Sequence, residues 1–114
     1  MKRLLFILTV AVLSSAFTWQ LLHLKLNVSI VDASGEPVEN AKVTLYSSDS
    51  DHTKEENALQ SGQTNKKGVV VFKKLATKSY YLAAKKGKLD NSLGDHETGI
   101  MHKGKINKIT LTIE

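Results

Sequence analysis

Cysteine is absent from the 114-residue chain, and arginine occurs once, at Arg3. Without cysteine there is no disulfide framework, no thiol nucleophile and no cysteine-linked lipid anchor, so stability must come from a hydrophobic core. The guanidinium group is the usual bidentate partner of phosphates and guanine edges. A chain almost without it is a poor candidate for nucleic-acid recognition, and we expect neither a nucleic-acid partner nor a cofactor.

The first residues have the pattern of a secretory signal. Lys2 and Arg3 precede an apolar run over residues 4–13, and Ser14, Ser15 and Ala16 supply the small residues of a cleavage site. We therefore expect residues 1–16 to be removed. If they are retained, the uncharged stretch to Leu22 is an alternative membrane anchor. Either way, the basic N-terminus predicts export of the rest of the chain to the periplasm or the cell surface, with membrane contact only in the uncleaved form.

Alternating apolar and polar residues dominate the remaining sequence. This period of two is typical of strands with one solvated face. The polar stretch at 47–57 has no apolar side chain, so we expect a mobile surface loop there, and residues 89–105 read mostly as turns. Strands are predicted at residues 24–31, 41–46, 59–64, 69–73, 80–85, 99–102 and 107–113. One domain over residues 24–114 is thus expected to be all-β, an antiparallel seven-stranded Greek-key β-sandwich.

Apolar residues and turn residues follow one another in a characteristic succession over residues 28–87. Its members are Val28, Ile30, Asp32, Gly35, Pro37, Val38, Ala41, Val43 and Leu45, then Thr64, Gly68, Val70, Phe72, Leu75, Tyr80, Leu82, Ala84 and Gly87. This order resembles the carboxypeptidase regulatory-like domain, a prealbumin-like (transthyretin-like) β-sandwich. The chain departs from that pattern at Asn65, where aspartate is usual, and at residues 76–78, where proline and glycine are usual. The resemblance implies a docking, spacer or support module rather than an enzyme.

The resemblance extends to Cna-B type sandwiches, which form an isopeptide bond between a first-strand lysine and a last-strand asparagine or aspartate. Alignment on Val31 and Asp32 places Ile30 at the lysine position. Lys25 and Asn107 are the only substitute pair we identify, and alternation puts Lys25 on the polar face. We therefore expect Lys25 to be a solvated surface residue and no isopeptide bond to form.

Positive charge is concentrated in the second half of the chain. Residues 66–114 hold eleven lysines against four acidic residues, whereas residues 17–65 have a net charge of −4. If residues 69–73 pair antiparallel with 80–85, five lysines gather at one end within about a Debye length, ~10 Å at 0.1 M salt. These five residues, the basic end, are Lys66, Lys67, Lys85, Lys86 and Lys88. They would attract an acidic protein, an anionic glycan or lipopolysaccharide. The competing interpretation is that these lysines only keep strand edges soluble.

Histidine and acidic residues suggest a second, weaker candidate. Asp95, His96 and His102 form the densest set of metal-ligand types, although a shared ion requires a turn near Gly99. His52 has no partner nearby in sequence and is expected to be a surface residue. We predict no metal site, and no catalytic residues either, because no serine has a nucleophile-elbow context.

These observations predict a non-catalytic exported β-sandwich that binds a protein of the cell envelope or supports an envelope structure. Contact is expected through exposed strand edges or through the basic end. The alternative is a carbohydrate- or metal-ion-binding module that uses the segments 47–57 and 89–103. Neither segment contains a phenylalanine, tyrosine or tryptophan, which argues against a glycan site.

Overall fold

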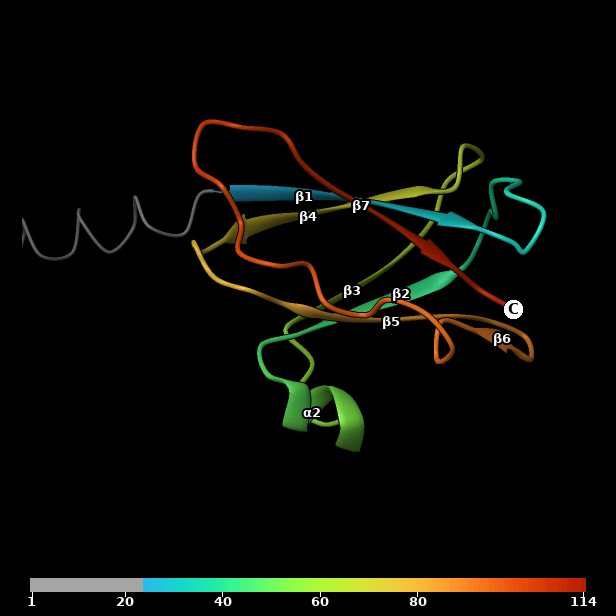
Figure 1. Cartoon of the computed structure of the whole chain (residues 1–114), viewed down its shortest axis with the longest axis horizontal. Helices are drawn as coiled ribbons and strands as arrows, with labels where there is room; N and C mark the ends of the chain where they lie inside the picture. Colours follow the sequence, from blue (N-terminus) through green and yellow to red (C-terminus); the bar gives the residue numbers. More distant parts are fainter. Residues whose placement is uncertain (1–23) are drawn as a thin grey trace, which may run out of the picture.

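A computed structural model of the chain describes residues 24–114 (Figure 1). The predicted signal at residues 1–16, and its extension to Leu22, lie outside the described residues. In chain order the elements are β1 (Leu24–Val31), β2 (Lys42–Tyr46), α2 (Asp49–Lys54), β3 (Gln60–Gln63), β4 (Val69–Leu75), β5 (Tyr81–Lys86), β6 (Leu89–Asp90) and β7 (Asn107–Thr112). Across the described part of the chain, no helix is long and apolar enough to span a bilayer.

The strands form two sheets that face each other (Figure 1). Sheet A has the strand order β4-β1-β7, and sheet B has the order β3-β2-β5-β6. Seven strands in two layers agree with the expected sandwich, but the expectation of a wholly antiparallel fold was wrong. The first and last strands run parallel, with Leu26 opposite Asn107 and Val31 opposite Thr112. The expected Greek-key order of connections stays a prediction.

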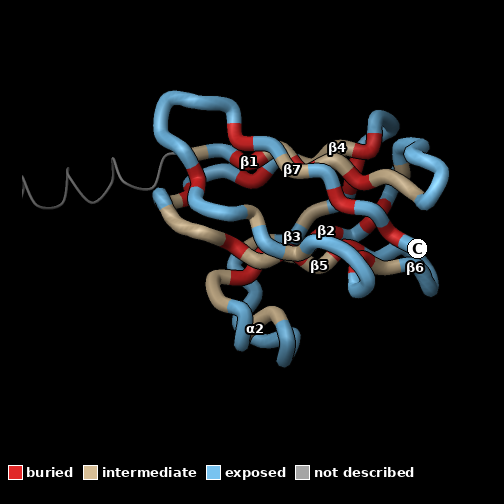
Figure 2. The backbone as a smooth tube through the Cα atoms, in the orientation of Figure 1, coloured by how far each residue is buried: buried red, intermediate tan, exposed pale blue. Residues whose placement is uncertain are grey.

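Alternation along the strands fills the space between the sheets. From sheet A, Leu26, Val28 and Ile30 of β1 are fully buried, and Leu82 and Ala84 of β5 meet them from sheet B. Figure 2 shows buried segments in both layers of the sandwich. Phe72 and Tyr80, both expected in the core, are buried there too. Burying apolar surface at about 25 cal/mol per Å² is the main stabilising contribution for a chain without disulfides.

Two short turns end strands where the sequence predicts them. The Asp32 carboxylate accepts hydrogen bonds from the backbone N–H groups of Ser34 and Glu36, closing the turn after β1. The Asn65 side chain similarly accepts from Lys67 and Val69 before β4. Gly68 adopts φ +76°, and an added Cβ would lie 2.8 Å from the Ile30 carbonyl oxygen. Glycine is therefore required there both by conformation and by space.

Three local expectations were wrong. The segment 47–57 contains the short helix α2 rather than only mobile loop, and residues 99–102 form no strand. The additional strand is instead β6, which pairs with the end of β5. β4 and β5 belong to different sheets, so the antiparallel pairing from which the basic end was inferred does not exist. Alternation identifies which face of a strand is buried, but not which strand is its neighbour.

Candidate functional site

Helix α2 lies on the outer face of sheet B (Figure 1). Ser48 caps its first turn by accepting a hydrogen bond from the Asp51 N–H, and Glu55 ends it in the left-handed conformation at φ 54°. Asp49 and His52 are three residues apart, so their side chains share one face of the helix. That face is turned toward β5 and the segment that follows β6.

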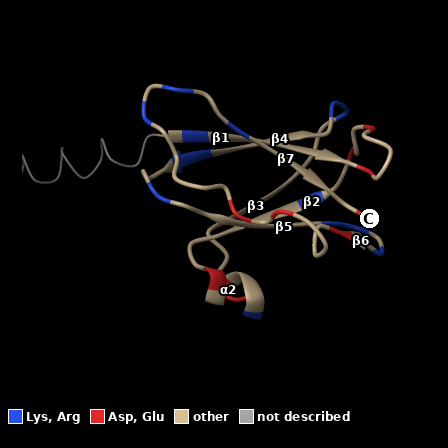
Figure 3. Cartoon of the chain, viewed as in Figure 1, with Lys and Arg blue, Asp and Glu red and all other residues tan. Residues whose placement is uncertain are grey.

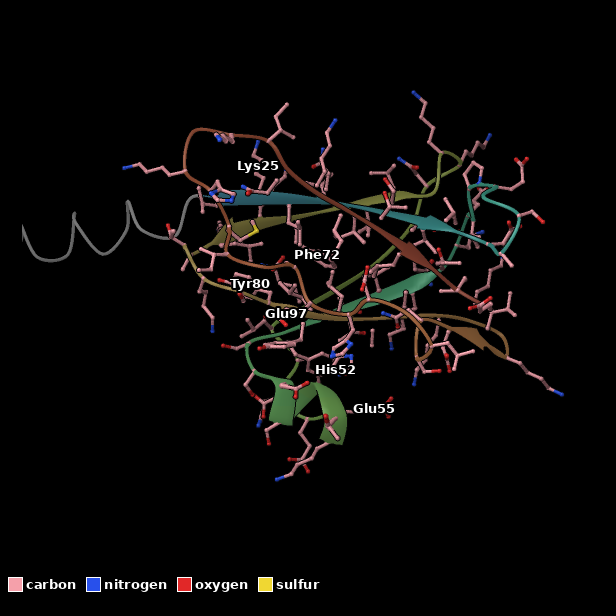
Figure 4. All side chains as sticks on the ribbon, viewed as in Figure 1. Lys25, His52, Glu55, Phe72, Tyr80 and Glu97 are labelled. Carbon is pink, nitrogen blue, oxygen red and sulfur yellow. The ribbon has the colours of Figure 1, made fainter. Side chains whose placement is uncertain are left out.

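His52 and His96 meet at this contact although they are 44 positions apart in sequence. Their rings stack with centroids 4.8 Å apart and an interplanar angle of 19°. The Asp49 Oδ1 atom lies 3.6 Å from His96 Nε2. One ligand atom from each of these three residues lies within 4.8 Å of the others. Figure 4 shows His52 between α2 and sheet B. We call Asp49, His52 and His96 the histidine cluster.

The backbone of Leu82 in β5 positions both histidines. Its carbonyl oxygen lies 3.0 Å from His52 Nε2, and its N–H donates to the His96 carbonyl oxygen at 2.7 Å. A carbonyl oxygen only accepts, so His52 Nε2 carries a hydrogen, and Nδ1 is the nitrogen whose lone pair is available in the neutral ring. His52 is therefore half-buried and held in place, which corrects the expectation of an unpartnered surface histidine.

Asn91 fixes the segment that carries His96. Its side chain is buried, accepts a hydrogen bond from the Ala84 N–H, and donates to the carbonyl oxygens of Leu82 and Asp95. Three bonds satisfy most of the capacity of this amide and tie residues 91–95 to β5. His96 thus projects from a segment anchored on both sides, because the Thr98 N–H also donates to the Tyr80 carbonyl oxygen.

The histidine cluster borders an open depression of about 530 Å³. Asp90, Ser92 and Lys85 also line it, and a second depression of about 340 Å³ lies beyond the Lys85–Glu55 pair. Lys85 Nζ lies 2.6 Å from Glu55 Oε1. The hydrogen bond and charge of Lys85 lower the pKa of Glu55, and those of Glu55 raise the pKa of Lys85. This pair links the end of α2 to β5.

The expected metal-ligand set is only partly brought together. His96 belongs to the histidine cluster, but Asp95 and His102 do not. His102 is exposed, and its N–H donates to the buried Asn107 side chain. Sequence reasoning missed Asp49 and His52 because their partner comes from a distant segment. The Ser48–Asp51 cap was the available signal, since it predicts a helix that would place Asp49 and His52 on one face.

Basic and acidic residues lie close together at the end of the sandwich that carries the C-terminus (Figure 3). Lys85 is paired with Glu55, and Lys86 Nζ donates to the Glu39 carbonyl oxygen at 2.7 Å. Asp90 lies opposite Lys85 in the β5–β6 ladder. Hydrogen bonds from Ser92 are the main cause of the lowered pKa of Asp90, and the charge of Lys85 lowers it further. Two of the five lysines are therefore engaged by neighbouring groups, and the basic end as a binding surface stays a prediction.

Isopeptide chemistry has no set of residues to support it in the described part of the chain. Lys25 is exposed on the outer side of sheet A, as alternation predicts (Figure 4). Asn107 binds the backbone of His102 through both ends of its amide. Within residues 24–114, no lysine, aspartate or glutamate is buried. The position aligned with the reactive lysine is the fully buried Ile30.

One strand edge of the sandwich is long and open. Ile113 N–H donates to the Val31 carbonyl oxygen, so alternate β7 residues back to Asn107 face β1. Lys108 and Thr110 therefore direct their backbone groups outward, and in the described part of the chain β7 is the edge strand of sheet A, with β1 as its one strand neighbour. The edge strands on the other side of the sandwich, β4 of sheet A and β3 of sheet B, contact each other. Gln60 Nε2 of β3 donates to the Lys73 carbonyl oxygen of β4. β6 is only two residues long.

Solved structures show the same fold at low sequence identity. The TIE protein of Bacillus anthracis is 20% identical with a TM-score of 0.55, the match covering 79% of this chain and 16% of that one. BcpA, the major pilin subunit of Bacillus cereus, is 12% identical with a TM-score of 0.55, covering 80% and 29%. A Pseudomonas aeruginosa protein, provisionally described as carbohydrate binding, is 17% identical with a TM-score of 0.53, covering 82% and 90%.

This chain spans less than a third of the length of the two Bacillus proteins. No curated protein matches it. The prealbumin-like sandwich expected from the sequence is confirmed, whereas the narrower assignment to the carboxypeptidase regulatory-like domain stays a prediction. The family model described as SpaA, prealbumin-like fold domain, matches residues 25–109. The chain therefore belongs to the family of SpaA prealbumin-like fold domains.

Proposed function

We propose that this chain is a non-catalytic, exported module that binds a protein partner at the cell surface or in the periplasm. Family membership supports a structural role, and BcpA, a distant structural relative, is a pilin subunit. The single observation that carries the proposal is the open edge of β7. An unpaired strand edge is a template for an added strand.

The composition of β7 suits reversible strand addition. Lys108, Thr110 and Thr112 are exposed, while Ile109 and Leu111 face the core. The β-branched residues favour extended structure, and Lys108 discourages uncontrolled pairing between copies. A partner strand would gain main-chain hydrogen bonds from Lys108 and Thr110 without disturbing the ladder to β1.

The test removes one outward N–H and leaves the fold intact. Proline is tolerated at edge positions whose N–H faces solvent. Thr110→Pro should therefore abolish capture of a partner from envelope extract, whereas Thr110→Ala, which keeps the N–H, should capture as the parent does. Capture should persist at ~0.5 M salt, because main-chain pairing is screened far less than surface charge.

Two results would contradict the proposal. Equal capture by Thr110→Pro would exclude the β7 edge as the docking surface. Capture that disappears in salt, or when Lys66 and Lys67 are changed to serine, would assign binding to the basic end instead. Circular dichroism of each variant establishes that the sandwich is folded.

A further inference from the structure

We propose that Asp49, His52 and His96 form a binding site for a divalent transition-metal ion of the zinc class. This site lies on the outer face of sheet B and is independent of the proposed strand addition at β7. It joins α2 to the segment after β6, two parts of the chain that share no backbone hydrogen-bond ladder.

The donor set favours zinc-class ions over calcium or magnesium. Two imidazole nitrogens and one carboxylate oxygen suit Zn²⁺, Ni²⁺ or Cu²⁺, whereas Ca²⁺ and Mg²⁺ require mainly oxygen ligands. Bonds of about 2.0–2.1 Å in a tetrahedral site place ligand atoms about 3.4 Å apart. The Asp49–His96 distance of 3.6 Å is already close to that value. The ligand atoms of all three residues lie within 4.8 Å of one another, and the stacked rings must turn toward each other for both nitrogens to face one ion.

His52 already has the outer contact that a metal-binding histidine needs. Such histidines usually donate their second ring N–H to a carbonyl or carboxylate oxygen, which fixes the ring and directs the other nitrogen to the ion. The Leu82 carbonyl oxygen, 3.0 Å from His52 Nε2, supplies this contact. Asn91 donates to the same oxygen at 3.1 Å, so the acceptor itself is held in position.

The site provides three ligands and leaves room for another. Zinc with three protein ligands keeps a position for water or an incoming group. The adjoining depression of about 530 Å³, lined also by Asp90 and Ser92, can hold a water or a small ligand at that position. Tyr46 and Tyr81 lie beside the two histidines, with ring centroids 5.6 Å from His52 and 6.2 Å from His96 respectively.

Titration of the purified protein with zinc chloride alone, followed by calorimetry, tests the proposal. One equivalent should bind to the parent protein. His96→Ala and Asp49→Asn should each weaken binding by about tenfold or more, the range expected when a metal site loses a supporting contact or a ligand. His102→Ala is the matched control, because His102 is exposed and outside the histidine cluster, and its affinity should equal that of the parent.

A spectroscopic measurement separates this site from non-specific histidine binding. Co²⁺ should give visible absorption bands typical of tetrahedral coordination, and the bands should vanish in His52→Ala. The proposal would be overturned by no binding to the parent, by equal losses in His102→Ala and His96→Ala, or by unchanged binding in His96→Ala. In the first case Asp49 and His96 would form only an ion pair. Melting curves without metal confirm that each variant is folded.

Discussion

The two sheets bury similar apolar faces but differ on their outer faces. Sheet A presents Asn27, Ser29 and Thr110 outward, and α2 makes no substantial contact with its strands. Sheet B presents Tyr46 and Tyr81, and α2 and the segment 91–98 pack against that side. Covering the aromatic rings with another element removes apolar surface from water, which is favourable, whereas hydroxyl and amide groups can stay in contact with water. One sandwich thus offers an open edge on one sheet and a side-chain cluster on the outer face of the other.

The largest expected effect tests whether the inner faces are equivalent. Leu82→Ala in sheet B and Leu26→Ala in sheet A each remove a fully buried side chain. Each should lower the free energy of unfolding by about 2–5 kcal/mol, measured by urea titration. Leu82→Ala keeps the backbone carbonyl that positions His52, so the folded fraction should still bind zinc. A lower free energy of unfolding in only one of these two variants would show that the two inner faces do not share one core.

An intermediate effect compares the buried asparagines that anchor a loop to each sheet. Asn91→Ala leaves the Ala84 N–H and the Asp95 carbonyl without their partner, at a cost of about 1–3 kcal/mol. Asn107→Ala frees the backbone of exposed His102, which water can satisfy, so its cost should be about 0.5–1.5 kcal/mol. Hydrogen exchange should accelerate at Leu82 and Thr98 only in Asn91→Ala. Acceleration at these amides in Asn107→Ala would mean that the two loops are coupled.

The smallest effect concerns the exposed Glu55–Lys85 pair that links α2 to sheet B. The lowered pKa of Glu55 gives stability that is present above its unfolded value of 4.5 and is lost as pH falls through the folded value. The raised pKa of Lys85 gives stability that is present below 10.5 and is lost as pH rises through the folded value. Lys85→Met should therefore lower the urea midpoint slightly at pH 7 and less at pH 3 or in high salt. A difference independent of pH and salt would assign the effect to packing of the lysine stem.

Strand positions were predictable because alternation is a local property of the sequence. Residues 24–31 and 107–113 alternate clearly, and the turns at Asp32 and Asn65 have local side-chain hydrogen bonds that a sequence reader can anticipate. Strand partners were not predictable, since the parallel β1–β7 pair joins residues about 80 positions apart. The strand order cannot be read from periodicity alone.

The histidine cluster was hidden for a related reason. His52 lies on a six-residue helix without an apolar stripe, and hydrophobic periodicity therefore gave no sign of α2. His96 lies in a segment whose position depends on the buried Asn91, and asparagine in a turn-like sequence normally indicates a surface turn. Only the folded chain brings these residues into one place.

The parallel β1–β7 pair determines how this protein resists being pulled. Tension applied at residues 24 and 114 acts along two neighbouring strands at opposite ends of their shared ladder, from Leu26–Asn107 to Val31–Thr112. The ladder is then loaded in shear, and its hydrogen bonds must fail together rather than one after another. Rupture under load is governed by the rate of unfolding rather than by equilibrium stability. A modest core can therefore be combined with high resistance to force along this direction.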